Sequence, residues 1–154
     1  MHIRELNEIA ATTYKKVFGE NFYGWVEWSN RMKVIIGNCR SNGRIALNRK
    51  YYEKYGRKEI LSVLYHELAH LYCFKKIGKH NHNNPLFLKS LNKIGGTMFG
   101  KRMPTKVHIY QCPSCKKQWL FKKKLITDLA CSTCSKGTYD KKFQINFIGF
   151  KIIE

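Results

Sequence analysis

Apolar residues recur every three or four positions in three segments of the chain, which is the pattern of helices with one buried face. The first segment covers residues 3–18, the longest covers residues 58–77, and the third runs from Pro85 to Ile94. A glycine, a common terminator of helices, directly follows each segment. The pattern therefore predicts three helices, of which the one over residues 58–77 is central and largely buried.

Short apolar or alternating runs occupy much of the remaining chain. Three of them, residues 22–28, 33–36 and 44–47, are separated by Ser-Asn, Gly-Asn and Ser-Asn-Gly breaks that are typical of turns. They predict a small antiparallel sheet beside the helices. Two further runs, residues 118–121 and 143–150, predict strands in the last third of the chain. We therefore expect an α+β fold.

A linker is predicted over residues 98–105, where neither periodicity persists. The chain of 154 residues can hold one domain of about 100 residues and a small module that needs outside help to fold. We therefore expect two domains, residues 1–104 and 105–154.

The composition is that of a globular protein, with 44% apolar and 14% aromatic residues, which excludes wholesale disorder. No run approaches the roughly 20 apolar residues of a membrane helix. The first residues also lack the apolar core of a signal peptide. We therefore expect a cytoplasmic protein that does not bind membranes.

The charge of the chain is strongly one-sided. Its net charge is +19, from 29 Lys and Arg against 10 Asp and Glu, and thirteen of the basic residues lie between Leu68 and Thr127, where no acidic residue occurs. Such an excess exceeds what solubility requires and favours a polyanionic partner, with nucleic acid ahead of an anionic membrane. A merely basic surface is the alternative interpretation.

The longest predicted helix carries the sequence HELAH at residues 66–70. His66 and His70 lie four residues apart, so both imidazoles leave one face of the helix as two ligands of a zinc ion do. Glu67 lies about 100° around the helix from His66, where its carboxylate can accept a proton from a water molecule that attacks a peptide carbonyl. Histidines that are merely hydrogen-bonded in the core are the alternative.

A catalytic zinc site needs a third protein ligand and one open position. The metzincin continuation is excluded because Cys73 and Lys76 stand where it requires glycine and histidine. A nearby glutamate is excluded by the absence of acidic residues between Leu68 and Thr127. The ligand is therefore a histidine or cysteine, and the candidates are Cys73, His80, His82 and His108. His80 and His82 lie in a loop after the helix that can fold back over the metal.

Four of the six cysteines form two CxxC pairs with fifteen residues between them, namely Cys112, Cys115, Cys131 and Cys134. This spacing is typical of a structural four-cysteine zinc site, which stabilises a module that has too few apolar residues to fold unaided. A redox pair is the alternative. Cys39 and Cys73 are expected to be ordinary reduced thiols.

The segment between the two cysteine pairs interleaves aromatic residues with lysines. Such a composition can stack bases while it neutralises phosphates. A nucleic-acid contact is therefore predicted at Lys116, Lys117, Trp119, Lys122, Lys123 and Lys124. Packing of Trp119 in the core of the small module is the alternative.

These motifs in this order, from a helix and a small sheet through HELxH and a loop histidine to a four-cysteine ribbon, resemble the short bacterial type of SprT-like zinc metallopeptidase. That family is related to the DNA–protein crosslink protease Spartan. Its third-ligand histidine precedes an aromatic residue by four or five positions, and His82 precedes Phe87 by five. The resemblance therefore implies His82 as the third ligand rather than His80.

The resemblance further implies a SprT-like metallopeptidase domain over residues 1–104 and a zinc ribbon over residues 105–154. It implies a zinc-dependent endopeptidase that acts on DNA-associated or DNA-crosslinked proteins, with one catalytic zinc and one structural zinc. The expected partners are DNA, single-stranded or partly so, and DNA-bound proteins, and the expected state is a monomer. The alternative is a nucleic-acid-binding zinc protein whose HExxH site is not catalytic.

Overall fold

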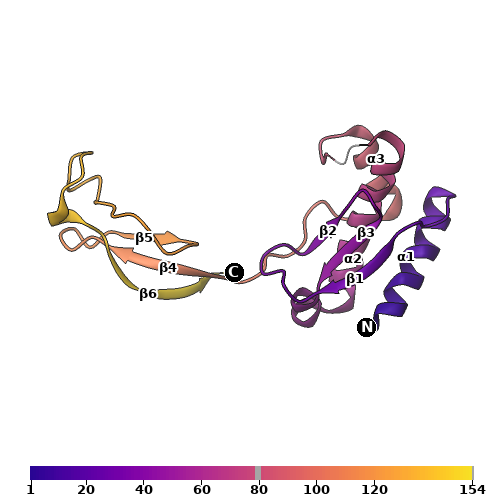
Figure 1. Cartoon of the computed structure of the whole chain (residues 1–154), viewed down its shortest axis with the longest axis horizontal. Coiled ribbons are helices and arrows are strands. Elements are labelled where there is room, and N and C mark those ends of the chain that lie inside the picture. The colour runs from indigo at the N-terminus through magenta and orange to yellow at the C-terminus, as the bar shows by residue number, and fades with distance from the viewer. Residues whose placement is uncertain (79–80, 154) are drawn as a thin grey trace. The chain divides into compact units, whose positions relative to one another are not determined.

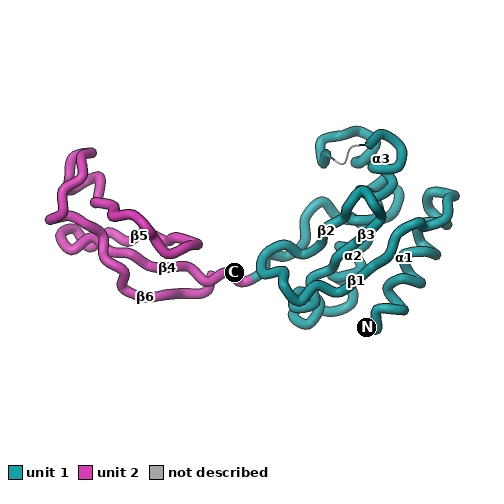
Figure 2. The backbone as a smooth tube through the Cα atoms, in the orientation of Figure 1, with its two compact units in different colours: residues 1–103 teal, residues 104–154 magenta. Residues whose placement is uncertain are grey.

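Two compact units make up the chain, residues 1–103 and residues 104–154, in a computed structural model that describes residues 1–78 and 81–153 (Figure 2). The division falls one residue before the predicted domain boundary. The candidate histidines of the HELAH motif lie in the first unit, and the four clustered cysteines lie in the second.

Within its described residues, the first unit contains three helices, α1 (Ile3–Phe18), α2 (Arg49–Ile77) and α3 (Pro85–Ile94) (Figure 1). The predictions for α1 and α3 are confirmed. None of the helices within the described residues is long and apolar enough to cross a membrane.

Helix α2 begins earlier than predicted. The side chain of Asn48 caps its first turn by accepting a hydrogen bond from the backbone N–H of Tyr51, and Gly56 then interrupts the helix with φ 78° and ψ −171°. The kink breaks the 3.6-residue periodicity, so the apolar pattern reveals only the part that follows Gly56. That part carries the HELAH motif.

The sheet of the first unit consists of β1 (Trp25–Ser29), β2 (Gly37–Cys39) and β3 (Arg44–Asn48), with β3 between the other two (Figure 1). Strands β2 and β3 are antiparallel, but β1 runs parallel to β3, so the prediction of an antiparallel sheet is wrong for β1. The reason is the strand order. Strand β3 forms an antiparallel pair with β2 but lies between β2 and β1, and there it runs in the same direction as β1.

A second correction concerns residues 33–36, which were predicted to be a strand. They belong to the loop before β2, and the side-chain amide of Asn48 donates to two carbonyls of that loop, Met32 O at 3.3 Å and Ile35 O at 2.8 Å. Val34 and Ile35 are exposed, so their apolar character does not mark a buried strand.

One hydrophobic core holds the first unit together. Helices α1 and α2 pack against the sheet, and α3 packs against α2. The core includes Ile45 and Leu47 of β3, Leu64 and Leu68 of α2, and Phe87 of α3, all with exposed fractions of 0%. The half of α2 that carries the HELAH motif is thus fixed on both sides by apolar packing.

The second unit is a three-stranded antiparallel sheet formed by β4 (Thr105–Gln111), β5 (Gln118–Phe121) and β6 (Asn146–Ile153), with β4 in the centre. The prediction for β5 is confirmed. Strand β6 begins later than predicted because a short 3₁₀ helix, η1 (Lys141–Phe143), precedes it and is capped by the side chain of Asp140.

Candidate metal centres

Three histidine side chains converge in the first unit. His66 and His70 project from one face of α2, and His82 projects from the segment that precedes α3. Their Nε2 atoms lie 3.0 Å apart in every pair. A tetrahedral zinc centre with bonds of about 2.0–2.1 Å separates its nitrogen ligands by about 3.4 Å, so the three donor atoms fit one zinc ion.

The orientation of His66 is set by a partner far along the chain. Its Nδ1 lies 2.9 Å from the backbone carbonyl oxygen of Thr97. Because a carbonyl oxygen only accepts hydrogen bonds, Nδ1 is the protonated nitrogen, and Nε2 keeps its lone pair for a metal. Burial lowers the pKa of His66 and thereby favours the neutral form that a metal ligand requires.

The ring of Phe87 underlies all three imidazoles and has an exposed fraction of 0%. It stacks on His70 with a centroid distance of 4.3 Å and an interplanar angle of 19°. It meets His66 and His82 edge to face, both at 5.2 Å. One buried aromatic side chain therefore limits the rotation of all three histidine rings.

The other candidates for the third ligand lie elsewhere or are not described. Cys73 is fully buried on α2 and stands outside the histidine group, and His108 lies on β4 of the second unit. His80 lies outside the described residues. Among the described residues, His82 completes the set.

Glu67 lies beside the histidines with only 6% of its surface exposed. Burial raises the pKa of its carboxyl to about 8, and a hydrogen bond from the backbone N–H of Cys39 opposes that shift. The side chain is not part of the histidine group. The carboxyl group therefore has a higher proton affinity than that of an exposed glutamate.

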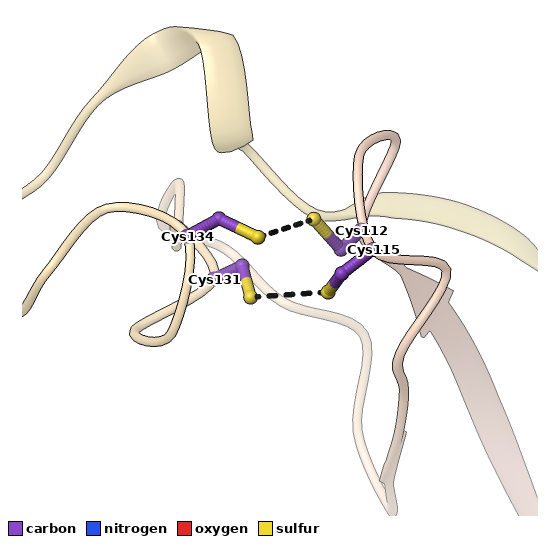
Figure 3. A group of neighbouring side chains, drawn as sticks. All are labelled: Cys112, Cys115, Cys131 and Cys134. Atoms are coloured by element: carbon purple, nitrogen blue, oxygen red, sulfur yellow. Dashed lines mark hydrogen bonds between the residues drawn. The ribbon is translucent and has the colours of Figure 1, made fainter.

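Four cysteine side chains meet in the second unit (Figure 3). The sulfur of Cys112 lies 3.9 Å from that of Cys134, and the sulfur of Cys115 lies 3.7 Å from that of Cys131. All four sulfurs lie within 4.8 Å of one another. A tetrahedral zinc with bonds of about 2.3 Å separates its sulfur ligands by about 3.8 Å, so this group also fits one zinc ion and leaves no position open.

The predicted nucleic-acid residues divide into two kinds. Trp119 is half-buried and packs against the small core of the second unit. The lysines of the predicted contact are all exposed, namely Lys116, Lys117, Lys122, Lys123 and Lys124. The side chains thus present positive charge to solvent, and the contact itself stays a prediction.

Two backbone groups that contact His66 and Glu67 carry no local motif. The carbonyl of Thr97 and the amide of Cys39 are backbone groups, which any residue supplies, so the sequence contains no signal for them. Phe87 does have a sequence signal, because it follows His82 by five residues, the spacing that the family resemblance implies.

Comparisons with known proteins show which family the chain is similar to. The model of the SprT-like family matches residues 4–110. The chain is 31% identical to the protein named Protein SprT-like of Anoxybacillus flavithermus, over 87% of this chain and 93% of that protein. It is 26% identical to the protein of that name in Bacillus cereus and 27% identical to that in Bacillus velezensis, again over 87% of this chain and over 93% and 95% of theirs.

Proposed function

This chain belongs to the SprT-like family, and from that premise we propose that it is a zinc-dependent endopeptidase acting on proteins that are associated with or crosslinked to DNA. The observation that carries the proposal is the convergence of three histidine Nε2 atoms beside a buried glutamate. The family membership and the geometry of the site both support the proposal.

The residues have separate roles in the proposed reaction. His66, His70 and His82 hold the metal. The carbonyl of Thr97 orients the His66 ring, and Phe87 contacts all three rings. Bound zinc would act as a Lewis acid on the carbonyl of the scissile peptide bond. Glu67 accepts a proton from the attacking water and can then deliver it to the leaving amine.

The number of ligands favours catalysis over a purely structural role. Structural zinc sites have four protein ligands, as the cysteine group does, whereas catalytic sites have three and keep a position open. Among the described residues, the histidine group offers three, and one of them, His82, is exposed. A substrate can approach such a site from solvent.

The second unit is the better candidate for binding nucleic acid. Residues 104–154 contain ten lysines against three acidic residues. Phe147 and Phe150 of β6 are 45% and 51% exposed, their rings contact each other at 4.9 Å, and Lys106 Nζ lies 3.6 Å from the centre of the Phe150 ring. Exposed aromatic rings beside lysines suit single-stranded DNA, whose bases are free to stack.

The test compares the wild-type protein with Glu67→Gln. Both are loaded with zinc and incubated with a basic DNA-binding protein, with and without single-stranded DNA, and proteolysis is followed on a gel. We expect cleavage by the wild type that increases with DNA, and a rate at least about 100-fold lower for Glu67→Gln. Zinc content is expected to be equal in the two proteins.

The matched control is Glu53→Gln, the same change at an exposed position of the same helix, which should leave cleavage unchanged. If folded, zinc-loaded wild type cleaves nothing under any condition, the peptidase proposal fails. The nucleic-acid-binding zinc protein then becomes the better account.

A further inference from the structure

Strand β2 is an edge strand that lies against α2 at the position of Glu67. Ile36 O accepts from Asn48 N at 3.0 Å, and Arg40 N donates to Arg44 O at 2.9 Å, so the even-numbered residues bond to β3. Bonded and non-bonded pairs alternate along an antiparallel ladder. Gly37 and Cys39 therefore turn their N–H groups away from β3, to the outer edge of the sheet.

Because Gly37 has no side chain, the side chain of Glu67 can occupy the space next to it. A Cβ atom at this position would lie 2.7 Å from Glu67 Oε1, 3.1 Å from its Cγ and 2.6 Å from Val63 Cγ1. Two of these separations are shorter than any real carbon contact. The strand thus approaches the carboxylate so closely that a side chain at residue 37 has to displace it.

Cys39 supplies the polar partner of the same carboxylate. Its backbone N–H, which has no partner on β3, donates a hydrogen bond to the carboxyl group of Glu67. A carboxyl group that is only 6% exposed needs such a donor, because a buried polar group without a hydrogen-bond partner is destabilising. The thiol of Cys39 is not required for this contact.

We propose that β2 positions Glu67 for proton transfer: the missing side chain of Gly37 gives the carboxylate its place, and the backbone N–H of Cys39 holds it there. Gly37 and Cys39 are positioning residues and act through Glu67. The role of Glu67 in proton transfer rests on the proposed function, but the contact between β2 and Glu67 can be measured without catalysis.

The first measurement is amide hydrogen exchange of Cys39 in the zinc-loaded full chain. The Cys39 amide should be protected in the wild type and exchange about tenfold faster in Glu67→Ala, the factor that corresponds to the loss of one hydrogen bond. Glu67→Gln keeps a carbonyl acceptor and should retain the protection. The amide of Asn38, which bonds within the sheet, should not change in either variant.

The second measurement is the activity of Gly37→Ala beside its neighbour Asn38→Ala, whose side chain is exposed. We expect kcat of Gly37→Ala to fall about 100-fold, as displacement of a catalytic group by 1 Å can cost, with KM and zinc content unchanged. The melting temperature should fall modestly, because the added methyl group also meets the buried Val63 side chain. Asn38→Ala should keep wild-type kcat. Gly37→Ala should also lose the protection of the Cys39 amide.

The two proposals can fail separately. A wild type that cleaves nothing defeats the proposed function, while the exchange experiment still decides whether β2 holds Glu67. An active wild type with unchanged Cys39 exchange in Glu67→Ala, or with full kcat in Gly37→Ala, overturns the positioning role alone.

Discussion

The histidine group and the cysteine group each offer the ligands of one zinc ion, but different structures hold them. The histidines lie on and beside α2, which is anchored in a core of eighteen buried residues. Among the described residues, the second unit has a core of four, Tyr110, Cys112, Cys131 and Ile145, and two of those belong to the cysteine group. In the first unit apolar packing assembles the ligands, whereas in the second the ligands form much of the packing.

This difference implies different roles for the two proposed zinc ions. A site that the fold assembles in advance can leave a coordination position open for a substrate. A site that replaces a hydrophobic core has to use all its positions to join chain segments, and metal binding then becomes part of the folding free energy. Substitutions at corresponding parts of the two sites should therefore have unequal effects on stability.

The largest effect is expected for Cys131→Ser in the second unit. Structural zinc contributes about 10–16 kcal/mol of apparent binding free energy in small zinc domains, so loss of one thiolate should leave residues 104–154 unfolded. Dispersed amide resonances of the second unit should collapse while those of residues 1–103 stay. Ser114→Ala, an exposed position between two ligands, is the control. A folded second unit in Cys131→Ser would contradict the comparison.

A smaller effect is expected for Phe87→Ala in the first unit. Truncation of a buried phenylalanine costs about 3–5 kcal/mol, and the free energy of unfolding of the first unit, measured with denaturant in the presence of a chelator, should fall by that amount. Zinc affinity at the histidines should also fall, because the ring touches all three. Leu88→Ala, at an exposed neighbouring position of α3, should change neither quantity.

The sequence predicted what is local in these sites and missed what is not. His66 and His70 follow from one helical turn, and the four cysteines follow from the spacing of two pairs, so short-range geometry was sufficient. Thr97 lies 31 residues from His66, and its contribution is a carbonyl that every residue has. The place of Gly37 against Glu67 depends on how a strand packs on a helix, which no local pattern encodes.

The same contrast between local and long-range features explains which predictions of the fold were correct. Helices α1 and α3 carry their periodicity and their end signals within themselves, and both were predicted with their observed bounds. Whether β1 is parallel or antiparallel to its neighbour depends on the side of β2 on which β3 is added. The first part of α2 has no continuous apolar pattern with the rest of the helix, because the kink at Gly56 interrupts it. Both errors arise where the arrangement is decided by tertiary packing rather than by periodicity.

The smallest effect is expected for His66→Ala, which removes a ligand just as Cys131→Ser does. The His66 ring is partly exposed, and its Nδ1 bonds to one backbone carbonyl. Without metal, the free energy of unfolding of the first unit should therefore change by about 1 kcal/mol or less. Zinc measured per chain should fall from two to one, and proteolysis should stop. If instead the first unit of His66→Ala unfolds in the presence of zinc, and that of metal-free wild type is no better folded, the histidine zinc supports the fold as the cysteine zinc does. The main argument for an open coordination position would then fail. The alternative, a zinc protein that only binds nucleic acid, would be better supported.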